Sequence, residues 1–307
     1  MAGAAFAQEY PVKSIRLVVG FAPGGGSDVI ARLIAPKLSE TLGQTVVVEN
    51  RPGATGTIGA ATVVRAPPDG YTVLMGVTST IAVSPSLLTK LPYDTLRDLV
   101  AVGQVVTFPN VLVVHPSVPT KSLKELIEFA RARPNTLNYA SGGLGTSDHL
   151  GGELLKSMAK INIVHLPYKG GGPAVIAILG GEVDMTFATL PSVTQHIRNG
   201  RLRPLAVTGT QRSAFLPEVP TMIQSGLPGF EVVTWLGLLA PTGTPREVIV
   251  KLNTAVNAVM GNADVRALVA AQAGDVVTGT PEQFGALIRR DSERWAKVIR
   301  EAGIKAE

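Results

Sequence analysis

Short apolar segments rich in β-branched residues alternate with segments of helical periodicity along the whole chain. A strand is expected over residues 15–21 and a helix after it, because Ile30, Ile34 and Leu38 recur at helical spacing. Comparable apolar or periodic segments lie at residues 45–49, 72–75, 102–114, 123–133, 137–140, 163–166, 174–179, 183–187, 205–208 and 232–240. Such alternation is typical of domains built on parallel sheets, so we expect an α/β fold.

The chain length favours two domains, since 307 residues is about twice the usual length of one domain. No linker rich in serine, proline or charge divides the sequence, and no internal repeat is present. We therefore predict domains that exchange segments through two paired crossover strands, at residues 102–114 and 232–240. Residues 8–107 and 233–307 would then form a discontinuous domain 1, and residues 108–232 domain 2. A single large α/β domain is the alternative.

Composition excludes several classes of function. The chain has no cysteine, which excludes thiol catalysis, cysteine-zinc sites, iron–sulfur sites and disulfides. Apolar residues make up 45% and charged residues 17%, which excludes disorder. The formal net charge is +5, but the basic residues are scattered and aromatic residues make up only 5%, so we expect no nucleic-acid partner. A mild positive field of this kind favours small anions.

The N-terminus has a feature of exported proteins. Residues 1–7 read MAGAAFA, and Ala5-Phe6-Ala7 before Gln8 has the A-x-A form of a signal-peptidase site. We interpret residues 1–7 as the residual tail of a signal peptide and expect a periplasmic protein, with an ordinary alanine-rich terminus as the alternative. The sequence has no stretch of about 18 uninterrupted apolar residues, so no membrane span is expected.

A glycine-rich loop follows the first strand and leads into a helix. Glycines let the backbone approach a ligand closely, and the start of a helix offers unpaired N–H groups at the positive end of its dipole. The loop can therefore cradle an anion, or it can be a tight turn with a serine or aspartate cap. Its candidate binding residues are Phe21, Gly24, Gly25, Gly26, Ser27 and Asp28.

A second loop of the same kind follows the strand at residues 137–140 and also ends at a helix start. Its candidate binding residues are Ser141, Gly142, Gly143, Thr146 and Ser147. In open parallel sheets, ligands lie beyond the carboxyl ends of the strands, where such loops are found. Because the two loops belong to the two halves of the chain, they can face each other across a cleft and hold a carboxylate with neutral donors.

Four further positions in three segments are considered as site residues. Thr78 and Ser79 follow the strand at residues 72–75, where they offer small polar donors or form a plain turn. Tyr168 precedes another glycine-rich helix start, and it either lines a site or lies in a solvated loop. Asp184 enters a strand, where it either meets a ligand amine or bonds the backbone, and we favour the second role.

Motifs of enzymes are absent from the sequence. There is no Walker loop, and a dinucleotide-binding fingerprint would need glycine where Asp148 stands. The four histidines show no metal-binding spacing, and Ser27 is not in a G-x-S-x-G motif because Val29 takes the place of the last glycine. Ser147, Asp148 and His149 are adjacent on a helix and point to different faces, which argues against a Ser-His-Asp triad.

Several strings of the sequence occur together in an order that one protein family shares. They are Tyr10-Pro11, IRLVVGFAPGGGSD (15–28), VVVENRPGATGTIGA (46–60), PPDGYTVL (67–74), LPYDTLRDL (91–99), LNYASGGLGTSDHL (137–150), HLPYKGGGPAV (165–175), GGEVDMTF (180–187), LRPLAVTG (202–209), LPEVPT (216–221), Trp235-Leu236-Gly237, APTGTP (240–245) and Leu252-Asn253. Through these strings the chain resembles the Bug-type periplasmic receptors of tripartite tricarboxylate transporters. The resemblance extends from about residue 8 to residue 307.

The resemblance implies a type II periplasmic-binding-protein fold, in which two α/β domains are joined by crossover hinge strands with the ligand cleft between them. It implies a receptor that hands a small organic carboxylate to membrane permease subunits and uses no cofactor, and we expect a monomer. It also implies that loops 21–28 and 141–147 hold carboxylate oxygens through backbone N–H groups, hydroxyls and ordered waters. Thr78, Ser79, Tyr168 and the strand end at residues 184–188 would line the rest of the cleft.

One departure from the family pattern bears on the ligand. After the GGxVDxxF string, many members have Asp or Asn where this chain has Ala188, followed by Thr189. A less polar wall at Ala188 favours an aliphatic or aromatic mono- or dicarboxylate over an amino acid or a highly hydroxylated ligand. The alternatives are an α/β enzyme, either an acyl hydrolase or a dinucleotide-dependent enzyme, and a ligand sensor for a two-component system.

Overall fold

The computed structural model describes residues 10–88, 90–168, 170–301 and 303–304. The predicted signal-peptide tail, residues 1–7, lies outside the described residues. Strands and helices alternate along the chain, as the sequence pattern predicts. In chain order the elements are β1 (Ile15–Val19), α1 (Gly26–Leu42), β2 (Val46–Asn50), the 3₁₀ turn η1 (Ala54–Gly56), α2 (Thr57–Val64), β3 (Thr72–Val77), the π-helical turn η2 (Ser79–Val83), α3 (Ser84–Leu87), α4 (Thr95–Asp98), β4 (Leu99–Val114), α5 (Leu123–Ala132), β5 (Asn138–Ser141), α6 (Ser147–Ala159), β6 (Val164–Pro167), α7 (Gly171–Leu179), β7 (Met185–Thr189), α8 (Leu190–Arg198), β8 (Arg203–Val207), β9 (Val233–Pro241), α9 (Arg246–Gly261), α10 (Ala263–Ala271), β10 (Asp275–Val276) and α11 (Pro281–Glu301).

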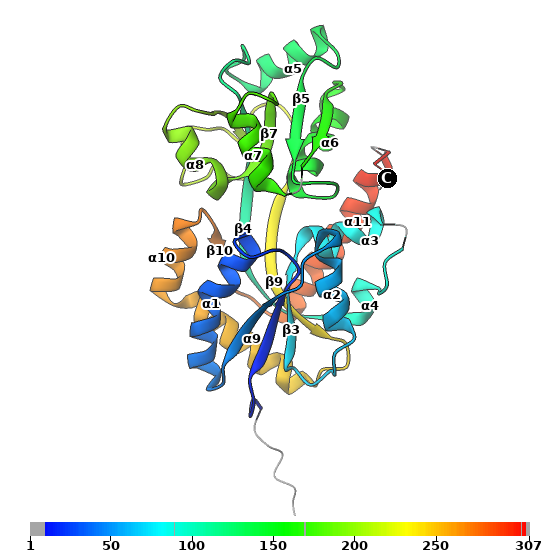
Figure 1. The fold of residues 1–307 in the computed structure, drawn as a ribbon, viewed down its shortest axis with the longest axis vertical. Helices are drawn as coiled ribbons and strands as arrows, with labels where there is room; N and C mark the ends of the chain where they lie inside the picture. Colours follow the sequence, from blue (N-terminus) through cyan, green and yellow to red (C-terminus); the bar gives the residue numbers. More distant parts are fainter. Residues whose placement is uncertain (1–9, 89, 169, 302, 305–307) are drawn as a thin grey trace, which may run out of the picture.

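Each half of the molecule is built on three parallel strands. In one half β1 lies between β2 and β3, and in the other half β5 lies between β6 and β7. The described strands pair in the order β2-β1-β3-β9-β4-β7-β5-β6, and β8 and β10 also pair with β4. Figure 1 shows the halves as a lower lobe with α1, α2, α9 and α10 and an upper lobe with α5 to α8. The fold is therefore of the α/β class that the sequence predicts.

Two long strands join the lobes. Strand β9 runs antiparallel to residues 99–109 of β4, and residues 110–114 of β4 then pair with β7 and β8 in the upper lobe. Figure 1 shows β4 and β9 side by side where they pass from one lobe to the other. Pro109 is tolerated in β4 because it stands where the strand leaves one sheet for the next, so its missing N–H interrupts no continuous ladder. The two extended segments predicted as crossovers are thus paired with each other.

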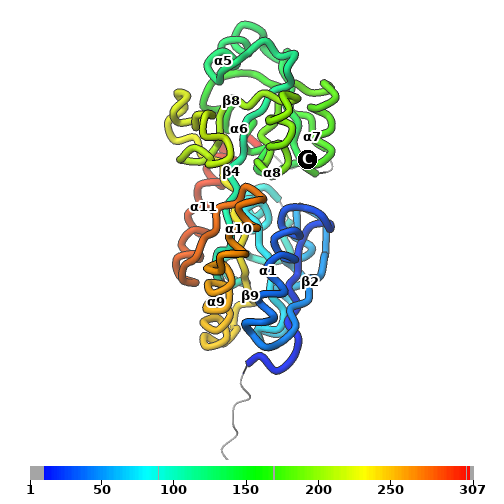
Figure 2. The backbone as a smooth tube through the Cα atoms, turned by 90° about the vertical axis from the view of Figure 1, so that its left-hand side faces the viewer, coloured from blue at the N-terminus to red at the C-terminus, as the bar shows by residue number. Residues whose placement is uncertain are grey.

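The helices cover the sheets through the apolar faces that their periodicity predicts. Helices α1 and α9 lie side by side on one face of the lower lobe (Figure 2). Ile34 and Leu38 of α1 are buried there in one cluster with Leu17 of β1 and Leu252 of α9. This packing fixes the start of α1 relative to the end of β1, and the first glycine-rich loop connects these two points.

Among the boundaries that differ from those expected from the sequence, three bear on the candidate site. Strand β1 ends at Val19, two residues early, because Gly20 turns the chain against Gly56: a Cβ at Gly20 would stand 2.7 Å from the Gly56 Cα. Strand β3 continues to Val77 and leads directly into η2, so residues 78–79 do not form an open loop. Strand β7 begins at Met185, which leaves Asp184 before the strand.

Candidate functional site

The first glycine-rich loop is held closed by an acidic residue of α1. The buried carboxylate of Asp28 accepts the N–H of Gly24 at 2.9 Å and the Nε–H of Arg32 at 3.0 Å. Asn50 of β2 donates to the same carboxylate at 2.8 Å and to the carbonyl oxygen of Phe21 at 2.9 Å. Burial alone would raise the pKa of Asp28, but these hydrogen bonds outweigh burial and hold the pKa below its usual range. The ionised carboxylate of Asp28 thus holds the loop to the start of α1.

The second loop repeats this arrangement at the start of α6. The buried carboxylate of Asp148 accepts the N–H of Gly142 and, at 3.2 Å, the N–H of His149. Burial raises the pKa of Asp148, because hydrogen bonds from neutral groups do not outweigh it, whereas the cation Arg32 supports Asp28. In both lobes an aspartate in the first helical turn ties the helix start to the loop before it.

The two loops lie on facing sides of the lobes. Figure 1 shows the start of α1 at the top of the lower lobe and the green loop before α6 at the bottom of the upper lobe. The lobes approach each other closely where the second loop meets α3, since a Cβ at Gly145 would stand 2.6 Å from Cδ2 of Leu87. The structure therefore brings the two predicted loops to the same region of the molecule.

Most glycine amides of the loops already have partners. The amides that donate within the loops or to the helix behind them are those of Gly24, Gly25, Gly142, Gly143 and Gly145. In contrast, the first-turn amides of Gly26, Ser27 and Ser147 make no hydrogen bond within the described residues, as is usual for the first turn of a helix. The backbone donors available to a ligand are therefore these helix-start amides. The sequence analysis expects the whole of each loop to bind a ligand through its N–H groups, but the other glycine amides named here already have protein partners.

Two histidine side chains contact the second loop, His149 from α6 and His165 from β6. His149 Nδ1 accepts the N–H of Gly145 at 3.1 Å, and His165 Nε2 lies 2.6 Å from Ser141 Oγ. The two imidazole rings are in contact, with centroids 4.5 Å apart. Burial, and to a smaller extent His165, lowers the pKa of His149 to about 4. His149 is therefore neutral at pH 7, which keeps on Nδ1 the lone pair that accepts the loop amide.

The other lower-lobe candidates lie beside the first loop and have different roles. The Phe21 ring packs on Gly56 of η1, where an added Cβ would stand 3.0 Å from ring atom Cε2. The Thr78 hydroxyl is engaged with β9, since it accepts the N–H of Trp235 at 2.8 Å and donates to the carbonyl oxygen of Trp235 at 3.3 Å. The Ser79 hydroxyl has no partner within the described residues, so Ser79 is the more available donor of this pair.

In the upper lobe, Tyr168 and Ala188 lie near the second loop, whereas Asp184 does not. The N–H of Tyr168 donates to the carbonyl oxygen of Ser141 at 2.8 Å. Ala188 is buried near the carboxyl end of β7, the end at which the parallel strand β5 enters the loop. The Asp184 carboxylate accepts the N–H of Asn138 at 2.8 Å, at the amino end of β5. Asp184 is therefore separated from the loop by the length of the strand and bonds the backbone, the role that the sequence analysis favours.

The side chains of Ser147, Asp148 and His149 do not form a triad. Ser147 Oγ accepts a hydrogen bond from Nδ2 of Asn110 at 3.0 Å, while Asp148 and His149 Nδ1 each accept a separate loop amide. Within the described residues, no group of three or more His, Asp or Glu side chains is placed to hold a metal ion. None of the helices in that part of the chain has both the length and the apolar character needed to cross a membrane.

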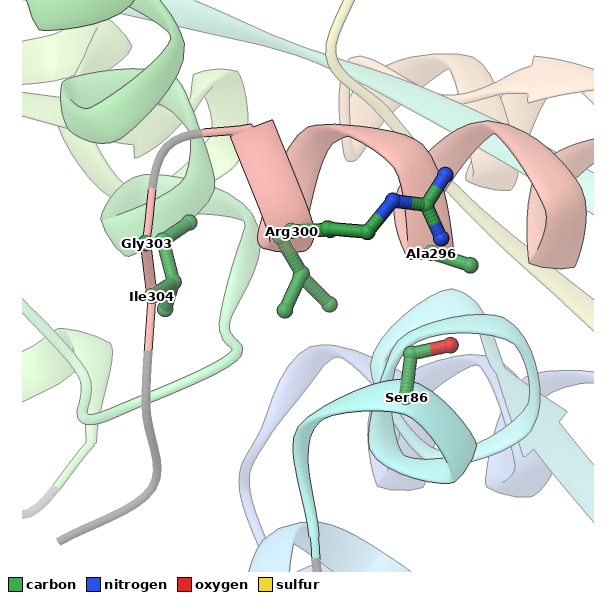
Figure 3. Close-up of a pocket in the computed structure, with 6 residues that line it drawn as sticks. Ser86, Ala296, Arg300, Gly303 and Ile304 are labelled. Atoms are coloured by element: carbon green, nitrogen blue, oxygen red, sulfur yellow. The ribbon is translucent and has the colours of Figure 1, made fainter.

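Two cavities in the described residues lie away from both loops. One of about 400 Å³ lies between α3 and the end of α11 (Figure 3), where it is lined by Ser86, Ala296, Ile299, Arg300, Gly303 and Ile304. Another of about 440 Å³ lies beside α4 and the start of α11. Neither is lined by a predicted site residue, so the candidate site is defined here by its polar groups.

Four supporting residues escape prediction from the sequence. They are Asn50, Asn110, His149 and His165. Asn50, His149 and His165 lie in strings that carry part of the family resemblance, but nothing in those strings indicates their contacts. Each makes its contact across segments that are distant in sequence or through a loop conformation, which periodicity and motif spacing do not reveal.

Comparison with known proteins agrees with this architecture. Residues 30–304 match the family described as "Tripartite tricarboxylate transporter family receptor". The protein BugT of Bordetella pertussis is 42% identical over 302 residues, which cover 97% of this chain and 92% of BugT. The structure of R. palustris Rpa4515 with adipate has a TM-score of 0.88 at 36% identity, with 97% of this chain and 99% of that chain covered. The structure of MatC from Rhodopseudomonas palustris with bound malate has a TM-score of 0.85 at 33% identity and covers 94% of this chain and 100% of that chain. The chain thus has the type II periplasmic-binding-protein fold and belongs to the family of tripartite tricarboxylate transporter receptors.

Proposed function

We propose that this protein is a periplasmic receptor that captures a small organic carboxylate and delivers it to the permease subunits of a tripartite tricarboxylate transporter. The observation that carries the proposal is the pair of facing helix starts, each with a serine side chain. Within the described residues, the amides of Gly26 and Ser27 in one and of Ser147 in the other have no partner. Such groups stabilise an anion without a cationic side chain. Related receptors with adipate and malate bound support the same class of ligand.

The proposed ligand is an aliphatic or aromatic mono- or dicarboxylate. The buried, apolar Ala188 near the second loop favours such a ligand over an amino acid, whose ammonium group would need an acceptor. The binding residues proposed here are Phe21, Gly24, Gly25, Gly26, Ser27, Asp28, Thr78, Ser79, Ser141, Gly142, Gly143, Thr146, Ser147, Tyr168 and Ala188. Within this set, the side chains of Asp28 and Thr78 and the amides of Gly24, Gly142 and Gly143 hold the site in shape, because these polar groups already have protein partners.

The proposal includes a hinge between two domains. Residues 8–107 with 233–307 would move as one body and residues 108–232 as the other, with the bend in β4 and β9. We propose a monomer that needs no cofactor. We also propose that the protein performs no catalysis, because Ser147, Asp148 and His149 at the start of α6 each bind a different partner. The ligand would then be released unchanged.

Thermal unfolding of the purified protein with a panel of carboxylates tests the proposal. Adipate, malate and benzoate are the probes, and adipamide, the neutral diamide of adipate, is the matched control. A ligand present at 100 times its Kd stabilises the folded state by about 2.7 kcal/mol, which raises Tm by several degrees. We expect at least one carboxylate to raise Tm and adipamide to leave it unchanged, with calorimetry giving the affinity.

Proton NMR of the same mixtures tests the absence of catalysis. Each carboxylate, and an ester of each, should remain unchanged after prolonged incubation with the protein. Conversion of any of them would favour the acyl hydrolase, and the absence of a Tm shift with every carboxylate would contradict the receptor. Uptake of the bound carboxylate by cells with and without this protein separates transport from two-component sensing, because only transport requires the receptor for uptake.

A further inference from the structure

We propose that Asn110, a residue of the crossover strand β4, orients the hydroxyl of Ser147 so that its hydrogen is donated to the bound carboxylate. The inference rests on the proposed function and deepens it, because it names a residue that decides which ligand groups the second loop accepts. Asn110 is fully buried. Its Nδ2 lies 3.0 Å from Ser147 Oγ at the start of α6 and 2.7 Å from the carbonyl oxygen of Phe187 in β7.

The orientation of the Asn110 amide is fixed by its neighbours. The carbonyl oxygen of Phe187 can only accept a hydrogen bond, so the group that faces it is the NH₂ group of the amide. The second hydrogen of this group is directed to Ser147 Oγ. Oδ1 of Asn110 is buried without a hydrogen-bond partner within the described residues. Turning the amide over would bury two unpaired N–H bonds there and place Oδ1 against the Phe187 oxygen, so the observed orientation is the stable one.

The backbone of Asn110 is held as firmly as its side chain. Thr208 Oγ1 accepts the N–H of Asn110 at 2.9 Å, and the N–H of Thr208 donates to the carbonyl oxygen of Asn110 at 2.8 Å. Asn110 is also the first residue of β4 that pairs with β7, immediately after the end of its pairing with β9. The donor that faces Ser147 is therefore anchored at the point where the crossover strand enters the upper lobe.

This contact determines what Ser147 can offer to a ligand. A serine hydroxyl carries one hydrogen, and when its oxygen accepts a bond from Asn110 that hydrogen is directed to another partner. Ser147 is the first residue of α6, and its backbone amide is also without a partner within the described residues. One residue thus presents two donors, N–H and O–H, which suits a carboxylate oxygen. A ligand ammonium or amide NH₂ group would find only the second lone pair of Ser147 Oγ as an acceptor, since Asn110 occupies the first and the backbone N–H of Ser147 can only donate.

A double-mutant cycle measured by calorimetry with adipate at pH 7 tests the inference. We expect Ser147→Ala to weaken binding about tenfold and Asn110→Ala about three- to tenfold, as for loss of one hydrogen bond to a charged ligand. In the Ser147→Ala background, Asn110→Ala should change the affinity less than about twofold, because no hydroxyl remains to be oriented. Losses that multiply in the double variant would overturn the inference, since they would mean that Asn110 acts independently of Ser147.

Two further variants separate orientation of the hydroxyl from general damage to the lobe. Thr186→Val is the matched control: it removes a buried hydroxyl of β7 that donates to the carbonyl oxygen of Ala140 at 2.9 Å, and it should leave adipate affinity within twofold. Asn110→Asp keeps the shape of the side chain but can accept the Ser147 hydrogen, so it should weaken adipate binding more than Asn110→Ala does. Binding by Asn110→Asp equal to that of the wild type would overturn the inference.

The outcomes also separate this inference from the proposed function. Far-ultraviolet circular dichroism and Tm confirm that each variant is folded, and if Asn110→Ala does not fold, Asn110→Asp takes its place in the cycle with Ser147→Ala. If the wild type binds adipate and the cycle is additive, the inference alone fails. If the wild type binds none of the carboxylates tested, the proposed function fails and this inference fails with it.

Discussion

At the level of single residues, Gly142 and Gly26 of the candidate site differ in the space that an added side chain would find. A Cβ at Gly142 would stand 2.8 Å from the backbone nitrogen of Gly171, so glycine at this position lets two loops of the upper lobe pack against each other. A Cβ at Gly26, the first residue of α1, would meet nothing within 4 Å. The fold therefore requires the small size of Gly142, whereas the exposed Gly26 has open space beside it.

Substitution of Gly26 tests whether that space belongs to the ligand. Gly26→Val should weaken adipate binding by about tenfold or more while Tm stays close to that of the wild type, because the added methyl groups contact ligand and not protein. Gly261→Val, at the end of α9, is the control, since a Cβ there also meets nothing within 4 Å. Calorimetry that gave Gly26→Val an affinity within threefold of the wild type would remove Gly26 from the site.

His149 should make the stability of the protein depend on pH. Its pKa is about 4 in the folded protein against an ordinary value of 6.5, so between these values the unfolded chain binds a proton that the folded protein does not. The free energy of unfolding should therefore be fully developed above pH 6.5 and fall as pH decreases toward 4, by up to about 3 kcal/mol. Urea unfolding at pH 7, 6 and 5 should give a flatter profile for His149→Gln. The acidic groups titrate in both proteins, so parallel profiles would contradict this role of His149.

Among the elements, α11 is tied to the crossover strand β9 by buried polar groups. Nε1 of Trp235 in β9 donates to Asp291 Oδ2 at 2.8 Å, and both residues are buried. Arg294 of α11 donates to the carbonyl oxygen of Glu231, just before β9. The Trp235 ring also packs edge-on against Phe284, with centroids 5.2 Å apart. The last helix thus braces one of the two strands that join the lobes.

Removal of the Asp291 carboxylate should loosen this brace. Asp291→Ala leaves the indole N–H of Trp235 buried without its acceptor, which costs about 1–3 kcal/mol in the free energy of unfolding. Asp291→Asn keeps an oxygen that can accept the indole N–H, so its loss should be smaller. Arg290→Ala removes only the exposed partner of Asp291 and should cost less than about 1 kcal/mol. Urea denaturation of the three variants gives this ranking, and a stable Asp291→Ala protein would refute the brace.

The elements also mark the limit of what the sequence reveals. The helix at Ile34 and Leu38 and the paired extended segments were predictable, because apolar spacing and segment length report burial directly. The contact of Asn110 with Ser147 was not predictable, because it exists only through the strand order that places β4 next to β7. Similarly, the position of Asp184 at the wrong end of the sheet depends on the point at which β7 begins, and strand boundaries are the least certain part of a sequence-based prediction.

At the scale of the whole molecule, the candidate site is divided between two bodies. Helix-start amides without a partner among the described residues lie at Gly26 and Ser27 in the lower lobe and at Ser147 in the upper lobe. Strands β4 and β9 run between the lobes. A ligand that accepts hydrogen bonds from both lobes stabilises the arrangement in which the loops are close together. Two paired strands are a narrow connection, so a bend spread over a few residues lets each lobe move as a unit.

Ligand binding should therefore make the protein more compact in solution. Small-angle X-ray scattering of the wild type should give a smaller radius of gyration with saturating adipate than without it, because the differential affinity of the ligand for the closed arrangement shifts the population of conformations. Gly26→Val, measured at an adipate concentration only just sufficient to saturate the wild type, is the control, and its scattering profile should change less. Adipamide should also leave the wild-type profile unchanged, which excludes an effect of added solute. A wild-type profile that stays constant while calorimetry reports saturation would mean that the site is preformed and that β4 and β9 do not bend when the carboxylate binds.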